Sequence, residues 1–158
     1  MTAAHRPKLV HLTTTDMSLD WLLAPQLQAF IAAGYEVVGM SAAGPHVERL
    51  AALGVRHVDV PSLTRAPSAA ADVRALFELR SLLRAERPDI LHTHNPKPGV
   101  LGRIAGRLAG VPVVVNTQHG LYAQPTDRLR RKAPVYALER VAAAFSHHEL
   151  VQNPEDVH

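Results

Sequence analysis

Short apolar, strand-like segments alternate with helix-like segments along almost the whole chain of 158 residues. The segment VPVVVNT is almost continuously apolar and rich in β-branched residues, which is typical of a strand covered on both faces. Strict alternation with short connections predicts βαβ units, and hence a Rossmann-like, doubly wound parallel sheet in a three-layer α/β/α architecture. The predicted strands are 9–14, 36–41, 55–61, 89–94, 111–117 and 147–153, and the predicted helices are 18–34, 45–53, 68–87, 100–110 and 127–145.

Capping and breaking residues set the expected ends of these helices. Ser18 is a candidate N-cap of the first helix, and Gly34 is a candidate C-terminal stop. Pro25 is expected to kink that helix or to open its second part, because proline lacks the N–H of an interior position. Pro88 ends the helix before the fourth strand, and Pro134 predicts a break in the basic helix near the end of the chain.

The composition is that of one globular domain without a thiol. Apolar residues make up 47% of the sequence, and a chain of this length buries about 70% of its extended surface on folding, which is enough for a core. Cysteine is absent, so disulfides and thiol nucleophiles are excluded. No apolar run reaches the ~20 residues of a membrane helix, and no signal-peptide pattern is visible. We therefore expect one cytoplasmic domain over residues 1–158.

The net charge of +3 is modest but unevenly distributed. Residues 97–140 carry a net charge of +6, and the remainder of the chain carries −3. Such a local excess favours an anionic partner, for example a phosphate, a nucleotide or an acidic lipid surface, although a solvated helix face explains the same pattern. The densest part lies in the last predicted helix, at Arg128, Arg130, Arg131 and Lys132.

Polar residues follow the fourth and fifth strands at their carboxyl ends, which is the edge where doubly wound sheets bind ligands. The sequence HNPK begins at His94, and the helix after it directs free N–H groups and its positive dipole end to the same place. His119 ends the fifth strand, and a neutral imidazole can accept a proton or bond a sugar hydroxyl. We expect these side chains to share one rim, with an ordinary helix-entry loop and an ordinary loop histidine as the alternatives.

Three histidines near this rim raise the question of a metal. His92 and His94 point the same way from one strand and His119 ends the next strand, so a zinc site is conceivable. His92 lies deeper in its strand, however, and no carboxylate stands nearby in the sequence to orient the ligands. We therefore predict no metal, and we interpret His92 as a hydrogen-bonded core histidine.

Several common site signatures are missing from the sequence. The connection after the first strand, LTTTDMSLD, contains no glycine, so the GxGxxG fingerprint of nicotinamide enzymes is absent, as is a Walker GK[ST] sequence. The G-x-S-x-G elbow of α/β-hydrolases is absent as well. Gly102 and Gly106 lie on one face of a helix, where we expect them to permit close packing on the sheet rather than to bind phosphate.

The central sequence ILHTHNPKPGVLGRIAGRLAGVPVVVNTQHGLY resembles the N-terminal domain of family-4 retaining glycosyltransferases of GT-B architecture. The matching order is a strand, H-[ST]-H, P-K-x-G, L-G-R-x-A-x-x-x-A-G-V-P, a second strand and H-G-[LF]. The opening βαβ unit and the ending AFSHHELVQNPEDV also resemble that family, so the resemblance covers nearly the whole chain. In that family two Rossmann-like domains face each other across a cleft, and the N-terminal one mainly binds the acceptor.

The resemblance implies roles for residues at the rim. His119 would contact the transferred sugar or position the acceptor, and Lys97 would line the cleft. The connection after the first strand would approach the donor phosphates or the acceptor, although the glycine-rich loop that many members have there is missing. Catalysis would be mostly electrostatic, with cations and helix dipoles stabilising the departing diphosphate. The residues assigned to binding or catalysis in this way are Thr14, Ser18, His94, Asn95, Lys97, His119 and Gly120.

The implied activity is transfer of a hexose from a nucleotide sugar to a lipid-linked or saccharide acceptor, in cell-envelope or exopolysaccharide synthesis. The nucleotide sugar would be a co-substrate, without a further cofactor and without nucleic acid as a partner. No second set of strands with the family's E-x7-E donor segment follows in this chain, so we expect the donor-nucleotide domain to lie outside this chain and the chain alone to be inactive. The basic residues 128–132 would contact an anionic inner membrane surface. The alternatives are a non-catalytic Rossmann-like module for a phosphorylated ligand and half of a sugar-nucleotide epimerase.

Overall fold

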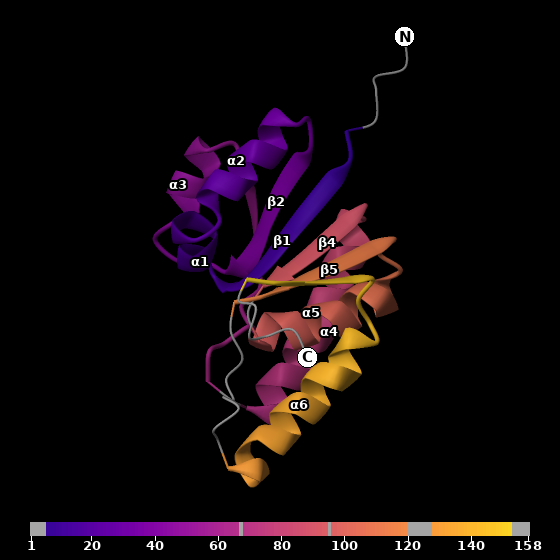
Figure 1. Ribbon diagram of the computed structural model, residues 1–158. Coiled ribbons are helices and arrows are strands. Elements are labelled where there is room, and N and C mark those ends of the chain that lie inside the picture. The colour runs from indigo at the N-terminus through magenta and orange to yellow at the C-terminus, as the bar shows by residue number, and fades with distance from the viewer. Residues whose placement is uncertain (1–5, 67, 95, 120–127, 153–158) are drawn as a thin grey trace.

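The computed structural model describes residues 6–66, 68–94, 96–119 and 128–152, which form a parallel sheet between two layers of helices (Figure 1). The strand order is β3-β2-β1-β4-β5-β6, as expected of a doubly wound fold. The strands are β1 (Lys8–Thr15), β2 (Glu36–Ala42), β3 (Arg56–Asp59), β4 (Ile90–His94), β5 (Val113–Gln118) and β6 (His148–Val151). The helices are α1 (Asp16–Trp21), α2 (Ala24–Ala32), α3 (Val47–Ala52), α4 (Ala69–Glu86), α5 (Pro96–Ala109) and α6 (Leu129–Ala143).

Helices α1, α2 and α3 cover one face of the sheet, and α4, α5 and α6 cover the other (Figure 1). Successive residues of a strand point to opposite faces, so Val10 and Leu12 join the core beneath α4 and α5. His11, between them, points to the other face, where its ring centroid lies 5.6 Å from that of Phe30 on α2. At position 11, β1 therefore places an imidazole rather than an apolar side chain beneath the layer formed by α1, α2 and α3.

The predicted first helix forms as two helices. The first strand runs directly into α1, which begins at Asp16, so the predicted N-cap Ser18 is wrong and lies buried inside α1. Asp16 Oδ1 accepts the backbone N–H of Met17 at 2.8 Å and so satisfies a free donor at the helix start. Pro25 is the second residue of α2, and Gly34 follows that helix with φ of 95°, both as predicted.

Two other helix boundaries differ from the prediction. α5 begins at Pro96, four residues earlier than the predicted start at residue 100, because proline fits the first helical position and Lys97 continues the turn. α6 is continuous, although Pro134 predicts a break. Both Pro134 and Arg130, whose carbonyl loses its helical partner, are exposed, so water can satisfy that carbonyl.

Helix α5 packs directly on the sheet through two glycines, as predicted. A Cβ atom at Gly102 would lie 2.4 Å from Leu12 Cδ2, and one at Gly106 would lie 2.6 Å from Leu91 Cδ2. Both separations are far shorter than a van der Waals contact, so any larger side chain would force α5 away from the sheet. The close approach fixes the first turn of α5 beside the carboxyl end of β4.

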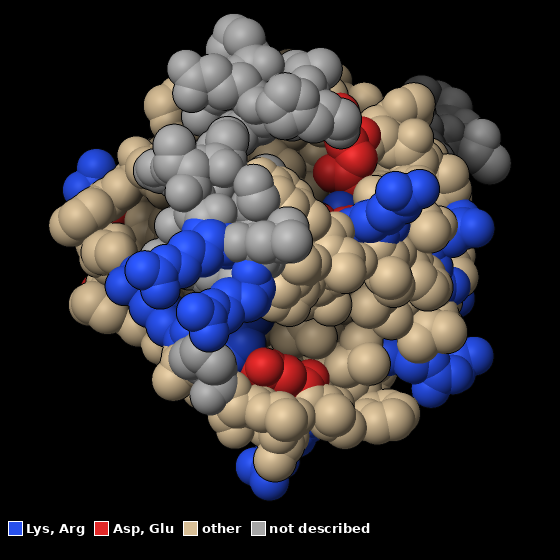
Figure 2. Space-filling model, turned by 60° about the horizontal axis from the view of Figure 1, so that its bottom comes forward, with Lys and Arg blue, Asp and Glu red and all other residues tan. Residues whose placement is uncertain are grey.

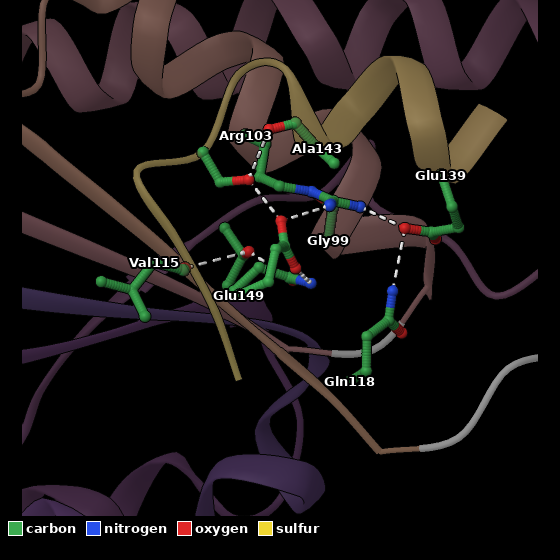
Figure 3. Close-up of polar contacts among 10 residues, drawn as sticks. Gly99, Arg103, Val115, Gln118, Glu139, Ala143 and Glu149 are labelled. Atoms are coloured by element: carbon green, nitrogen blue, oxygen red, sulfur yellow. Dashed lines mark hydrogen bonds and ion pairs between the residues drawn. The ribbon is translucent and has the colours of Figure 1, made fainter. Parts of the chain in front are cut away.

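A buried arginine of α5 holds α6 and β6 against the rest of the fold (Figure 3). The side chain of Arg103 is 1% exposed, and its two terminal nitrogens donate to Glu149 on β6 at 2.7 Å and to Glu139 on α6 at 2.5 Å. Its Nε donates to the Gly99 carbonyl at 2.8 Å, and Asn116 Nδ2 on β5 donates to the second oxygen of Glu149 at 2.7 Å. Every residue of β6 is exposed, so its attachment depends on this polar network and on its backbone pairing with β5.

Replacing Arg103 with Met should destabilise the fold by about 3 kcal/mol, because the mostly buried carboxylate of Glu139 loses its cation and Glu149 loses its ion-pair partner. Adding Glu139→Gln and Glu149→Gln to Arg103→Met should recover most of the loss, since no uncompensated charge then remains. Urea denaturation of the three proteins measures both effects. Equal stability of wild type and Arg103→Met would show that the network contributes little.

Candidate functional site

Strands β1 and β4 and the residues that directly follow β5 and β6 bring their polar side chains into one chain of hydrogen bonds. His11 Nδ1 lies 3.0 Å from His94 Nε2, and His94 Nδ1 lies 3.1 Å from His119 Nε2. His119 Nδ1 in turn lies 3.0 Å from Gln152 Oε1. His11 and His94 are fully buried, His119 is half-buried and Gln152 is exposed. This histidine chain therefore runs from the core to the surface at the carboxyl edge of the sheet.

His92 is a hydrogen-bonded core histidine, as predicted. Its side chain is buried, and its Nε2 lies 2.7 Å from Thr117 Oγ1 on β5. Its ring centroid is 4.1 Å from that of His94, and the planes are tilted by 32°. His92 thus packs beside the histidine chain, and its hydrogen bond to Thr117 leads to a hydroxyl group rather than to another ring.

The buried imidazoles are neutral near physiological pH. Burial, and to a lesser degree the charge that His92 would carry, lowers the pKa of His11 from 6.5 to about 3. Burial, then repulsion from His119, lowers the pKa of His92 to about 4. Burial first, then the three neighbouring imidazoles, also holds the pKa of His94 well below 6.5. Each of these rings therefore has one N–H and one lone pair to share.

The described residues contain one group with the spacing of metal ligands. His11, His92 and His94 have ring nitrogens that all lie within 4.8 Å of one another, so His11 and not His119 completes the trio. Zinc with Zn–N bonds of about 2.0–2.1 Å would hold the three nitrogens about 3.4 Å apart. Two of the rings are joined instead by a hydrogen bond of 3.0 Å and stack with an interplanar angle of 16°. The group suits ring-to-ring hydrogen bonding better than chelation.

Lys97 points away from the histidine chain. Its ammonium donates to the carbonyls of Thr64 at 2.8 Å and Ala66 at 2.7 Å, and it pairs with Asp72 Oδ1 at 2.6 Å. These contacts join the start of α5 to α4 and to the segment before α4. In this structure Lys97 is a tether between elements, whereas the sequence suggests a mobile cation.

The other predicted site residues lie elsewhere or outside the described residues. Thr14 is half-buried at the end of β1, and Ser18 is buried in α1 with its Oγ 3.5 Å from Thr15 Oγ1. Asn95 and Gly120 lie outside the described residues. The structure therefore joins His94 to His119, but it does not bring Thr14, Ser18 or Lys97 into that group.

The predicted basic cluster lies at the start of α6. Arg128 and Arg130 are exposed there, while the side chains of Arg131 and Lys132 lie outside the described part of the structure. Figure 2 brings the bottom of the molecule forward and shows Lys and Arg side chains gathered in one area of that face. Across the described residues, no helix is both long enough and apolar enough to cross a bilayer.

An apolar groove opens beside Lys97, between α4, α5 and α6. The cavity has a volume of about 250 Å³ and carries charged side chains at its margin, including Arg65 and Glu139. Leu138 contributes to its wall and remains 52% exposed. The apolar lining residues are Pro96, Val100, Leu101, Val135 and Leu138.

Sequence reasoning missed two members of the histidine chain and one carboxylate that shapes the rim. His11 lies in the middle of β1 and Gln152 directly follows β6, and only the tertiary structure reveals their neighbours. Asp16 Oδ2 accepts the backbone N–H of His46 at 2.8 Å and so fixes the segment after β2. A polar residue inside an otherwise apolar strand was the available signal for His11, because a buried imidazole needs a partner.

Comparison with known proteins places the chain in a family. The model of the glycosyl transferase 4-like domain matches residues 23–155, and the chain belongs to this family. It is 44% identical over 102 residues, 65% of this chain, to the Escherichia coli UDP-Gal:alpha-D-GlcNAc-diphosphoundecaprenol alpha-1,3-galactosyltransferase. It is 31% identical over 102 residues, 64% of this chain, to a Haemophilus influenzae UDP-N-acetylglucosamine–N-acetylmuramyl-(pentapeptide) pyrophosphoryl-undecaprenol N-acetylglucosamine transferase. The matches span 26% and 28% of these relatives, so the chain corresponds to about a quarter of their length.

Solved structures show the same fold at low sequence identity. Acinetobacter baumannii MurG superposes with a TM-score of 0.63 and 13% identity over 94% of this chain and 41% of its own. The UDP-N-acetylglucosamine 2-epimerase of Rickettsia bellii gives a TM-score of 0.66 and 13% identity over 95% of this chain and 40% of its own. With the family match, they confirm the Rossmann-like half of a GT-B architecture and the resemblance to a glycosyltransferase N-terminal domain.

Acidification should destabilise the protein through the buried histidines. Their pKa is about 3 for His11 and about 4 for His92 in the folded state, against 6.5 in the unfolded chain. Below pH 6.5 the unfolded chain binds protons that the folded state excludes. This contribution to stability is therefore complete above about pH 6.5 and falls by about 1.4 kcal/mol per pH unit for each histidine as the pH drops toward the folded values. Urea denaturation between pH 7 and pH 5 measures the slope.

A matched pair of variants assigns this slope. His92→Gln keeps a donor near Thr117 but does not titrate. The slope of stability against pH should therefore fall by the contribution of one histidine, about 1.4 kcal/mol per pH unit. His148→Asn, at an exposed position of β6, should leave the slope as it is in the wild type. Equal wild-type stability at pH 5 and pH 7 would contradict the neutral assignment.

Metal removal should not change stability, because the trio is better arranged for hydrogen bonds than for zinc. We expect untagged protein to melt within about 1 °C of the same temperature after dialysis against EDTA and with equimolar zinc. Zinc at 100 times its dissociation constant would instead stabilise the fold by about 2.7 kcal/mol, which is several degrees in Tm. Such a rise in the wild type, lost in His11→Phe, would establish a metal site.

Proposed function

We propose that this chain is the acceptor-side domain of a retaining glycosyltransferase that moves a hexose from a nucleotide sugar to a lipid-linked acceptor in cell-envelope synthesis. Its membership of the glycosyl transferase 4-like family supports this, as do relatives named for diphosphoundecaprenol acceptors. The observation that carries the proposal is the imidazole of His119 at the carboxyl edge of the sheet, where it is hydrogen-bonded to the buried His94. That edge is where ligands of doubly wound sheets bind.

In this proposal the chemistry is mainly electrostatic. The start of α5 lies beside the same edge and directs its positive dipole end there, which favours a phosphate or a developing negative charge. His119 contacts the transferred sugar or the acceptor. The nucleotide sugar is the co-substrate, bound mainly by a second domain outside this chain, and no metal or other cofactor takes part.

The groove beside Lys97 suits the apolar part of a lipid-linked acceptor. Apolar side chains of α5 and α6 line it, and Arg65 stands at its margin. Arg128 and Arg130 at the start of α6 would face an anionic lipid surface, so the protein would work in the cytoplasm at the inner face of the membrane. The lipid would then enter the groove from the membrane side.

A transfer assay tests the proposed activity. The chain is joined to its donor domain and supplied with UDP-galactose or UDP-N-acetylglucosamine and GlcNAc-diphosphoundecaprenol. We expect transfer with retention at the anomeric carbon, and a fall in kcat of about 100-fold in His119→Ala with folding intact, because one oriented polar contact to the reacting sugar is lost. His148→Asn should transfer at the wild-type rate. A wild-type rate in His119→Ala would remove the role of His119, and inversion would refute the retaining mechanism.

Vesicle binding tests the proposed membrane surface. Replacing Arg128 and Arg130 with Gln should weaken binding to acidic vesicles by about 2 kcal/mol, roughly 30-fold, because each basic side chain near such a surface contributes about 1 kcal/mol. Arg84→Gln with Arg87→Gln, at the opposite end of the sheet, should have little effect. Flotation with acidic and with neutral vesicles at low salt measures this. Equal wild-type binding to both kinds of vesicle would rule out the electrostatic contact.

A further inference from the structure

The histidine chain has a direction, because each ring-to-ring hydrogen bond contains only one proton. A neutral imidazole that donates through one nitrogen accepts through the other. The state of one ring therefore determines the state of the next along His11, His94 and His119. Only two arrangements are consistent throughout, one with every proton on Nδ1 and one with every proton on Nε2.

The outer end of the chain favours the first arrangement. Gln152 presents its Oε1 to His119 Nδ1 at 3.0 Å, so His119 Nδ1 carries the proton and donates. His119 Nε2 then accepts from His94 Nδ1, and His94 Nε2 accepts from His11 Nδ1. An amide group can turn over, however, so this end alone does not decide the direction.

The inner end favours the same arrangement independently. His11 Nε2 is buried and has no hydrogen-bond partner among the described residues. In the first arrangement this nitrogen is a lone pair, whereas in the second it is an N–H group without an acceptor. Orphaned buried N–H groups are rarer in proteins than under-used acceptors, because a buried donor without a partner loses a strong bond to water. The core therefore selects the proton on Nδ1 in all three rings.

We propose that His11 and His94 are positioning residues that fix His119 in its Nδ1–H form, so that His119 meets a ligand as a hydrogen-bond donor and not as a base. The Nε2 lone pair of His119, which is the basic site of such a ring, already accepts a hydrogen bond from His94 Nδ1 at 3.1 Å. The Nδ1–H group of His119 donates only to the exposed Gln152, and an oxygen of a bound molecule can replace that acceptor. Naming that molecule as a sugar rests on the proposed function, but the protonation pattern does not.

The burial of His94 fits a positioning role. A side chain that is 1% exposed cannot reach a ligand at the rim, although the sequence suggests that it does. Its two nitrogens link a core residue to a rim residue. His94 therefore acts on a ligand only through the orientation and protonation of His119.

Nitrogen-15 NMR of this chain, with labelled histidine and long-range proton–nitrogen correlation near pH 7.5, reads which ring nitrogen bears the proton. We expect His11, His94 and His119 in the Nδ1–H form in the wild type. His94→Asn places an amide donor close to the former Nδ1, so His119 should keep that form. His94→Leu removes the donor, and His119 should then exchange between both forms. Substitution of each histidine assigns its signals, and Gln152→Ala should leave the pattern unchanged because the core sets the direction.

Three results would overturn the proposal. The first is an Nε2–H form of His119 in the wild type, which needs no variant and so does not depend on variants folding. The second is a reversal of His119 in Gln152→Ala, which would give control to the surface amide. The third is an unchanged Nδ1–H form in a folded His94→Leu. The experiment requires no turnover, so failure of sugar transfer would count against the proposed function alone.

Discussion

The register of hydrogen bonds between β1, β4 and β5 is the constraint on which the site depends. It pairs His11 with His92 and His94 with Thr117, and it does so in parallel strands whose carboxyl ends meet at one edge. A shift of one residue in any of these strands would turn its side chains to the other face of the sheet. The apolar residues of the same strands prevent such a shift, because Val10 and Leu91 must remain in the core beneath α4 and α5.

The site therefore combines two kinds of environment. Its inner members are buried imidazoles that stay neutral because charging them inside the protein is unfavourable. Its outer member, His119, is half-buried and accessible from the rim. Neutral inner rings are a condition for the directional chain, since a protonated ring has two donors and would break the sequence of donor and acceptor.

Much of the fold follows from the sequence, because alternating apolar strands and helices with short connections leave few arrangements. The same reasoning located the carboxyl ends of β4 and β5 and the packing role of Gly102 and Gly106. It did not find His11, because a single sequence does not state which strand lies beside β4. It misjudged Lys97 for a similar reason, since its partner Asp72 lies on α4, and the sequence does not show that α4 and α5 pack side by side.

Helix α6 and strand β6 are attached to the rest of the fold mainly by polar contacts, and this attachment protects the edge of the sheet. Ala142 is the only fully buried residue among the described side chains of α6, and β6 buries none, so their separation from the core exposes little apolar surface. Local opening of this end therefore requires less free energy than opening of the central strands. Once β6 has left, the backbone groups of β5 become an unpaired border that accepts a strand from another molecule. By holding β6 in place, Arg103 thus keeps β5 from becoming an edge strand.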